Sequence, residues 1–196
     1  AFLKFTEYAA SSNAYTSFNR TVYLFSSTSY FKENLNLLLD FVQDPYFTDE
    51  NVEKEKNIIA QEISMYQDNP EWKLYFGTIS NMFKENGVKV DIGGTVDSIY
   101  KINKELLYEC YNTFYHPANM LLFVVGDLDI DYTIDLIRQN QNKKVFPVID
   151  SVKKKYVFES NEVNEKEKII EMDVSTPKVA VGIKNDQSKM QGVGKD

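Results

Sequence analysis

The chain has 196 residues, 43% of them hydrophobic and 14% aromatic, and its 29 acidic and 22 basic residues give a net charge of −7. This length and composition predict a folded domain with a short appendage. The acidic balance argues against binding to nucleic acid or to an anionic membrane surface, and no apolar run in the sequence approaches the ~18 residues that span a bilayer. A single cysteine, Cys110, excludes an internal disulfide and indicates a reducing, cytoplasmic location.

The first third of the chain predicts a strand and then an amphipathic helix. Residues 13–26 are rich in aromatic and β-branched side chains and predict one long strand. Apolar residues recur at helical spacing over 31–43, which predicts a helix packed on a sheet. Pro45 then ends this helix, because the residue before a proline is pushed out of the α region.

Residues 49–70 predict a second helix with two notable carboxylates. Thr48 is a suitable N-cap, and one apolar stripe is formed by Val52, Ile59, Ile63 and Tyr66. Glu55 and Glu62 border this stripe, about 20° apart in projection and ~10.5 Å apart along the axis. Such a pair could place one carboxylate at a site and the other behind it. A carboxylate on the margin of a helix is, however, usually only solvated.

The middle of the chain predicts two further helices. An aromatic stripe at helical spacing follows Pro70, and such a stripe is more typical of a core than of a binding surface. Another helix starts after Asn103, which can act as its N-cap. His116 is the only histidine of the chain, and its place before Pro117 favours a contact with the C-terminal end of that helix over metal binding.

The last third predicts a buried strand, a helix and a hairpin. Met120 to Val125 is a continuous apolar run, which predicts a central strand buried on both faces. Asp129 or Asp131 then caps a helix over residues 132–139. Residues 140–155, with basic clusters at 143–144 and 153–155, predict a linker. Residues 167–174 and 178–184 predict a hairpin around Pro177, and residues 187–196 predict a frayed end.

Four stretches together resemble the insulinase/pitrilysin family of zinc metallopeptidases, the inverzincins, and most closely its bacterial processing-protease-like members. Besides the helix with Glu55 and Glu62, the matching stretches are Ser12-Asn13-Ala14-Tyr15-Thr16-Ser17 followed by Thr21-Val22-Tyr23, Phe114-Tyr115-His116-Pro117-Ala118-Asn119-Met120, and Val124-Val125-Gly126-Asp127. In this family a His-x-x-Glu-His helix supplies two zinc histidines and a catalytic Glu, and a distant Glu completes the metal site.

The resemblance implies a fold, a domain organisation and a set of site residues. The expected class is α+β, an antiparallel or mixed sheet with helices packed on one face, as in one half of the metallohydrolase-like family domain. Residues 1–142 would be the latter part of the N-terminal peptidase-like domain, 143–164 a linker, and 165–196 the opening strands of a second, homologous domain. Glu62 would be the third zinc ligand and Glu55 its supporting carboxylate, while Asn13 and Ala14 would bind an extended peptide substrate through their backbone. From residue patterns alone, an ordinary sheet strand remains the alternative for residues 13–26.

The chain departs from the family because it contains no His-x-x-Glu-His motif. We therefore expect a fragment whose first residues, AFLKFTEY, are the end of the helix that carries the histidines in the family. The intact protein would be a Zn²⁺-dependent endopeptidase acting on peptides or small proteins, whereas this chain would bind no Zn²⁺ and would be inactive. The alternative is a non-catalytic, peptide-binding or scaffold subunit of the same fold. A homo- or heterodimer with a related half is also compatible with the resemblance.

A further hypothesis concerns how such a chain completes its sheet. Residues 178–184 would dock beside the strands at 13–26 and 120–125, within one chain or by exchange between two chains. This would give a circularly permuted version of one family half.

Overall fold

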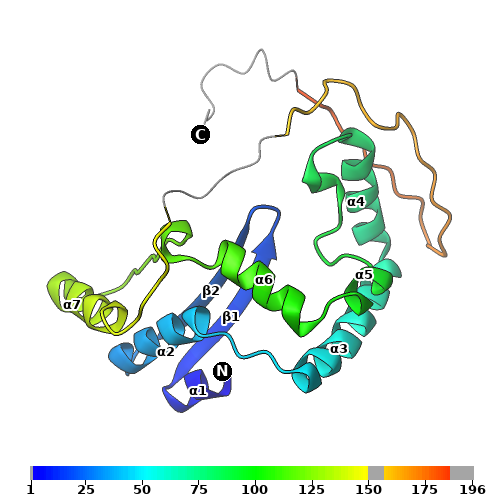
Figure 1. Cartoon of the computed structure of the whole chain (residues 1–196). Coiled ribbons are helices and arrows are strands. Elements are labelled where there is room, and N and C mark those ends of the chain that lie inside the picture. Colours follow the sequence, from blue (N-terminus) through cyan, green and yellow to red (C-terminus); the bar gives the residue numbers. More distant parts are fainter. Residues whose placement is uncertain (1, 150–156, 186–196) are drawn as a thin grey trace. The chain divides into compact units, whose positions relative to one another are not determined.

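The computed structural model describes residues 2–149 and 157–185 (Figure 1). The chain divides into two compact units, one of residues 1–52 and 103–154 and the other of residues 53–102 and 155–196. Helices and an antiparallel pair of strands make up the described chain, so the prediction of an α+β class is confirmed. The basic cluster at 153–155 and the end predicted to fray at 187–196 lie outside the described residues.

The first unit is built on a two-stranded hairpin. Strand β1 (Ala10–Ser17) pairs antiparallel with β2 (Arg20–Ser27), in a register that runs from Ala10 opposite Ser27 to Ser17 opposite Arg20. The prediction of one long strand over 13–26 was therefore wrong, because Phe18 and Asn19 form a two-residue turn in the middle of it. Composition alone hid this turn, since strand-forming residues stand on both sides of it.

Two helices pack with this hairpin to form the hydrophobic core of the first unit. Helix α2 (Phe31–Gln43) has the predicted bounds and contacts both β2 and α7 (Ile130–Gln141). The buried centre consists of Leu35, Leu39 and Leu136, and the partly buried side chains around it are Phe25, Phe31 and Ile137. Asp129 is the N-cap of α7, where its carboxylate accepts the Tyr132 N–H at 2.9 Å.

A polar network joins the end of α7 to α2. The Asn140 side chain is buried and donates to the Asn36 and Asp40 side chains at 2.9 and 3.0 Å. Lys144 forms an ion pair with Asp40 at 2.7 Å. The predicted linker therefore does not begin at Asn140, because this residue belongs to helix α7. Its burial could not be predicted, since asparagine is usually an exposed residue.

Short helices complete the first unit. Helix α1 (Phe2–Glu7) places the ring of Phe5 on that of Phe25, with centroids 5.8 Å apart. Helix α6 (Lys104–Phe114) is capped by Asn103, as predicted. The 3₁₀ helix η2 (Pro117–Asn119) follows it.

The Tyr23 hydroxyl lies 2.7 Å from that of Tyr115, and burial together with this contact raises the pKa of Tyr23 far above its usual value.

The second unit contains most of α3 (Asp49–Gln67), α4 (Pro70–Met82), the 3₁₀ helix η1 (Gly87–Lys89) and α5 (Val96–Tyr100). Trp72, the only tryptophan of the chain, stacks on Tyr66 with centroids 4.6 Å apart and donates its ring N–H to Asp91 at 2.6 Å. Sequence analysis missed α5, although its capping box of Thr95 and Ser98 was a usable signal.

Two segments predicted as strands do not form strands in the described chain. Leu121, Phe123 and Val125 are 89%, 81% and 79% exposed, so the prediction of a buried central strand over 120–125 was wrong. Residues 167–184 contain no ladder either, and the described sheet holds only β1 and β2. The hypothesis that 178–184 docks on this sheet within one chain was therefore wrong. Three of the apolar residues that this hypothesis expected to become buried are at least 80% exposed: Val179, Val181 and Ile183.

Residues 178–184 run along α4 instead. Lys178 forms an ion pair with Glu71 at 2.5 Å, and Lys184 donates to the Met82 carbonyl at 3.0 Å. Between them, the backbone at Gly182 comes so close to Met82 that a Cβ there would overlap its side chain. The polar ends and the small residue of this segment therefore face the helix, and its apolar side chains face solvent.

Candidate functional site

Helix α3, which carries the two candidate carboxylates, begins with a reciprocal cap. The Thr48 hydroxyl accepts the Asn51 N–H at 3.2 Å, and the Asn51 side chain accepts the Thr48 N–H at 2.9 Å. Asp49 and Glu50 occupy the first turn, where negative charge is favourable. The predicted start of this helix at Thr48 is therefore confirmed.

The buried face of α3 fixes which way its carboxylates point. Val52 and Ile63 are buried as predicted, and Ile59 and Tyr66 are half-buried. Lys56 and Ala60 are also buried, which shifts the centre of the buried stripe away from Glu55 and Glu62, so that the two carboxylates flank it. Lys56 has its ammonium group 2.7 Å from the carboxylate of Glu53. Sequence reasoning missed Lys56 because a lysine normally marks a solvated face.

Glu55 and Glu62 are exposed, and no described residue forms a hydrogen bond or an ion pair with either. Glu53 on the same helix differs, because its carboxylate forms an ion pair with Lys56. About two helical turns separate the two free carboxylates along one side of α3. Both are therefore available to an external cation or to hydrogen-bond donors from outside the described chain.

The second candidate feature is the outer edge of β1. Asn13 is exposed and Ala14 half-exposed, opposite Leu24 and Tyr23 of β2. The Ala14 N–H is accepted by the side chain of its neighbour Asn13 at 2.8 Å. Within the two-stranded sheet that the structure describes, β1 has no partner on its other side. Its backbone can therefore pair with an added extended strand. β1 and the carboxylates of α3 belong to different compact units.

The donor set for a metal ion is incomplete in the described chain. A catalytic zinc site uses three protein ligands and a water. The described residues contain no group of three His, Cys, Asp or Glu side chains that could hold a metal ion. A carboxylate such as that of Glu62 can offer a metal ion only one of these three ligands, and Cys110 is exposed without such a group around it. These residues alone do not fit a catalytic zinc ion.

His116 has a structural role. Its Nδ1 accepts the Ala118 N–H at 3.1 Å, and its Nε2 lies 2.8 Å from the Pro147 carbonyl, to which it must donate. Both ring nitrogens are thus engaged, and the residue is the N-cap of η2. The predicted contact with a helix C-terminus was wrong, because the chain turns at His116 into a new short helix.

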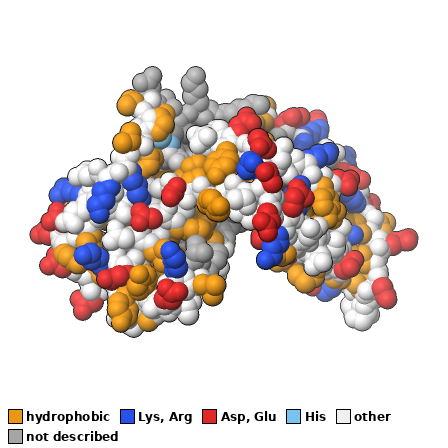
Figure 2. Space-filling model, turned by 60° about the horizontal axis from the view of Figure 1, so that its bottom comes forward, with side chains coloured by type: hydrophobic (Ala, Val, Ile, Leu, Met, Phe, Trp, Pro, Cys, Tyr) orange, Lys and Arg blue, Asp and Glu red, His pale blue; other side chains and the backbone are white. Residues whose placement is uncertain are grey.

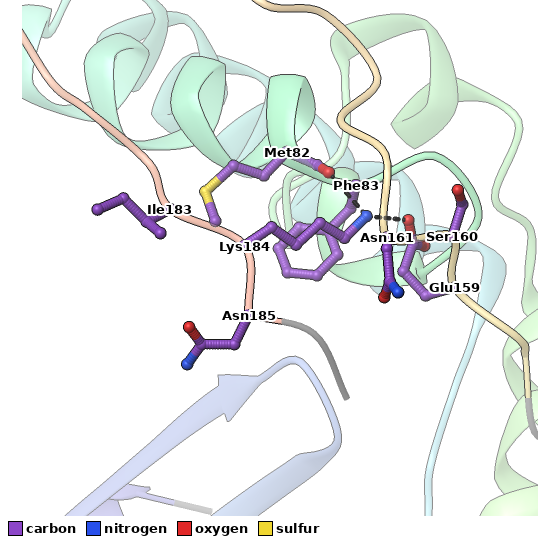
Figure 3. A pocket seen from close by; sticks show the side chains of 8 residues that line it. All are labelled: Met82, Phe83, Glu159, Ser160, Asn161, Ile183, Lys184 and Asn185. Carbon is purple, nitrogen blue, oxygen red and sulfur yellow. Dashed lines mark hydrogen bonds and ion pairs between the residues drawn. The ribbon is translucent and has the colours of Figure 1, made fainter. Parts of the chain in front are cut away.

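A buried charged cluster in the second unit was missed by sequence reasoning. Glu159 and Lys184 form an ion pair at 2.6 Å, beside a small cavity of about 180 Å³ (Figure 3). The contact with Lys184 and three backbone N–H groups lower the pKa of Glu159 to about 2. Nothing in the sequence signals this pair, because the two residues are 25 positions apart and no local spacing relates them.

On the face shown in Figure 2, acidic and basic side chains are interspersed with exposed hydrophobic ones. Among the described helices, none has the length and apolarity that a membrane span requires.

Comparisons with known proteins identify the family. Residues 2–96 match the model described as Insulinase (Peptidase family M16), and residues 101–189 match the model described as Peptidase M16 inactive domain. The chain is 57% identical over 184 residues to the protein named uncharacterised zinc protease YmfH of Bacillus subtilis. That match covers 94% of this chain and 43% of the relative.

Solved structures agree with this result. An M16-like peptidase from Alicyclobacillus acidocaldarius superposes with a TM-score of 0.79 at 44% identity, covering 84% of this chain and 39% of that one. A protease from Helicobacter pylori has the same fold, with a TM-score of 0.75 at 19% identity over 81% of this chain and 39% of that one. The chain thus spans about two fifths of the length of these relatives. It belongs to the insulinase family, peptidase family M16.

Proposed function

We propose that this chain is the part of a zinc-dependent metalloendopeptidase that supplies the third metal ligand, Glu62, and the supporting carboxylate, Glu55. In the intact protein, which would act in the cytoplasm on peptides or small proteins, a His-x-x-Glu-His segment supplies the remaining ligands and the base. The bound zinc ion would supply Lewis acidity and an activated water. The chain itself contributes the carboxylates and a strand edge for the substrate.

One observation carries this proposal: Glu62 is an exposed carboxylate without a partner among the described residues, on a well-capped helix within the region that matches the M16 family. A carboxylate already held in an ion pair would have to give up that partner before it could bind a metal ion. Glu62 has no such partner, and Glu55 lies on the same side of the helix. Relatives with the name zinc protease support the choice of metal.

The free edge of β1 supports a role in binding extended peptides. A peptide that adds a strand to this edge would accept the Ala14 N–H in place of the Asn13 side chain. Backbone pairing of this kind recognises extended chains with little dependence on their side chains. We assign the substrate backbone contacts to Asn13 and Ala14 on this basis.

The chain taken alone is proposed to be inactive, because the donors among its described residues do not fit a catalytic zinc ion and its sequence contains no His-x-x-Glu-His motif. The test compares this chain with one extended at its N-terminus by the family's His-x-x-Glu-His segment. Bound zinc and the cleavage of an unstructured peptide are measured for both. We expect zinc and cleavage only in the extended chain.

Stoichiometric zinc in the short chain would contradict the assignment of ligands. An extended chain that binds the peptide, but binds no zinc and does not cleave the peptide, would favour the scaffold function instead. The proposed domain boundaries, 1–142, 143–164 and 165–196, and a dimer with a related half remain predictions that these measurements do not address.

A further inference from the structure

A loop after α4 presents three consecutive backbone N–H groups to one carboxylate. Lys84, Glu85 and Asn86 donate to the Glu159 carboxylate at 2.8, 2.8 and 2.6 Å. The first donor reaches Oε1 and the other two reach Oε2, so both oxygens are used. Successive N–H groups that converge in this way form a concave anion site, often called a nest.

Lys184 completes the charge balance of this site. Its Nζ lies 2.6 Å from Glu159 Oε1 and also donates to the carbonyls of Met82 and Glu162 at 3.0 and 3.1 Å. The ammonium group also lies over the ring of Phe83, 5.2 Å from its centroid. The side chains of Lys184 and Glu159 are only 9% and 3% exposed. Both charges are thus buried, and every donor of the ammonium group has an acceptor.

A buried ion pair on its own is weak evidence for stability, because desolvation offsets the attraction between the charges. The backbone donors change this balance. Hydrogen bonds from N–H groups to an ionised carboxylate are among the stronger ones in proteins, and here three of them converge on one carboxylate. The acceptor that these three N–H groups share is one ionised carboxylate, that of Glu159.

We propose that the backbone of residues 84–86, together with Lys184, is a carboxylate-binding site that the chain fills with its own Glu159. We call residues 157–162 the strap. Its Glu159 carboxylate is the ligand that holds this segment against the loop after α4. Glu162, which pairs with the side chain of Lys84 at 2.7 Å, lies on the same strap but is mostly exposed. The site is independent of the zinc and substrate sites proposed above.

The test uses the full chain with Glu159→Ala, which removes a group the size of acetate. Amide hydrogen exchange is measured residue by residue, with and without added sodium acetate, and with sodium chloride at the same ionic strength. We expect the 84–86 amides to exchange about tenfold faster or more in the variant, and acetate but not chloride to restore their protection. Glu162→Ala is the matched control and should leave these amides protected.

Two results would overturn the proposal. Unchanged protection in Glu159→Ala would show that the carboxylate does not hold the loop. Lost protection that acetate does not restore would show that Glu159 acts only as part of its own segment and that the loop is no anion site.

A variant that fails to fold still gives an answer. If Trp72 emission shows that Glu159→Ala is unfolded, recovery of the folded emission on addition of acetate becomes the measurement. Absence of that recovery counts against the site. Glu159→Gln, which keeps the shape but not the charge, should fold and still lose protection at 84–86; full protection in this variant would also contradict a site selective for carboxylates.

Discussion

Glu159 and Lys184 are joined at 2.6 Å in a site where both side chains are almost fully buried. The pKa of Glu159 is lowered to about 2 from its usual 4.5, so the folded protein holds this carboxylate ionised more strongly than the unfolded chain does. A lowered pKa contributes stability that is present above pH 4.5 and is lost as the pH falls from 4.5 towards 2. Contact with Lys84 lowers the pKa of Glu162 as well and acts in the same direction.

We therefore predict that the second unit loses stability between pH 4.5 and 2, and that Glu159→Gln flattens this dependence. Urea unfolding followed by Trp72 fluorescence measures it, since the only tryptophan belongs to that unit. The urea midpoint is the quantity to compare, because Trp72 contacts Asp91 and its intensity could respond to pH directly. An equally steep loss of stability in Glu159→Gln would show that other carboxylates are responsible.

In the first unit, Leu136→Ala should destabilise the fold by about 2–5 kcal/mol, because it opens a cavity between α2 and α7. Ile130→Ala on the same helix is the matched control, since Ile130 is 73% exposed and should change stability by less than about 0.5 kcal/mol. Urea unfolding followed by far-ultraviolet circular dichroism gives both values. Similar values for the two variants would contradict the described packing of α7.

The strand edge at β1 can be tested by removing one donor. In the extended, active chain, Ala14→Pro deletes the N–H that the Asn13 side chain accepts in the structure. We expect KM for a peptide to rise about tenfold, the effect of one lost hydrogen bond, with a smaller change in kcat. Asn13→Ala keeps the N–H and should change KM less. An unchanged KM in Ala14→Pro would exclude backbone pairing at this position.

The supporting role of Glu55 predicts a graded effect. In the extended chain, Glu55→Gln should weaken zinc affinity or activity by about 10–100-fold, as is typical for residues that orient a metal ligand. A zinc titration with a competing chelator and the rate of peptide cleavage give the two values. Loss of all activity would place Glu55 at the metal itself, and no loss would leave it a solvated residue.

The longer helices could be predicted from the sequence because each is specified by its own residues, whereas the short helix α5 was missed. The spacing of Leu35 and Leu39, and the caps Asn103 and Asp129, are local signals that need no knowledge of the rest of the fold. Strand predictions failed because a strand depends on its neighbours. Leu121 and Phe123 have the composition of a buried strand, but no described strand pairs with them.

The candidate site could be predicted only where a family pattern exists. Glu62 is proposed as a ligand because its helix resembles one in the family, whereas the capping of His116 and the burial of Glu159 depend on residues far along the chain. Pro147 lies 31 positions from His116, and the backbone donors to Glu159 lie 73 to 75 positions from it. Neither contact follows from any local spacing.

The most direct test of the central proposal is the zinc content of the extended chain with Glu62→Gln, compared with Glu50→Gln. Glu50 is also an exposed carboxylate of α3, but it lies in the first turn, away from the proposed ligand. We predict one zinc ion per chain in the unchanged protein and in Glu50→Gln, and loss of zinc and of peptide cleavage in Glu62→Gln. Equal zinc content in the two variants would contradict the assignment of Glu62 as a metal ligand.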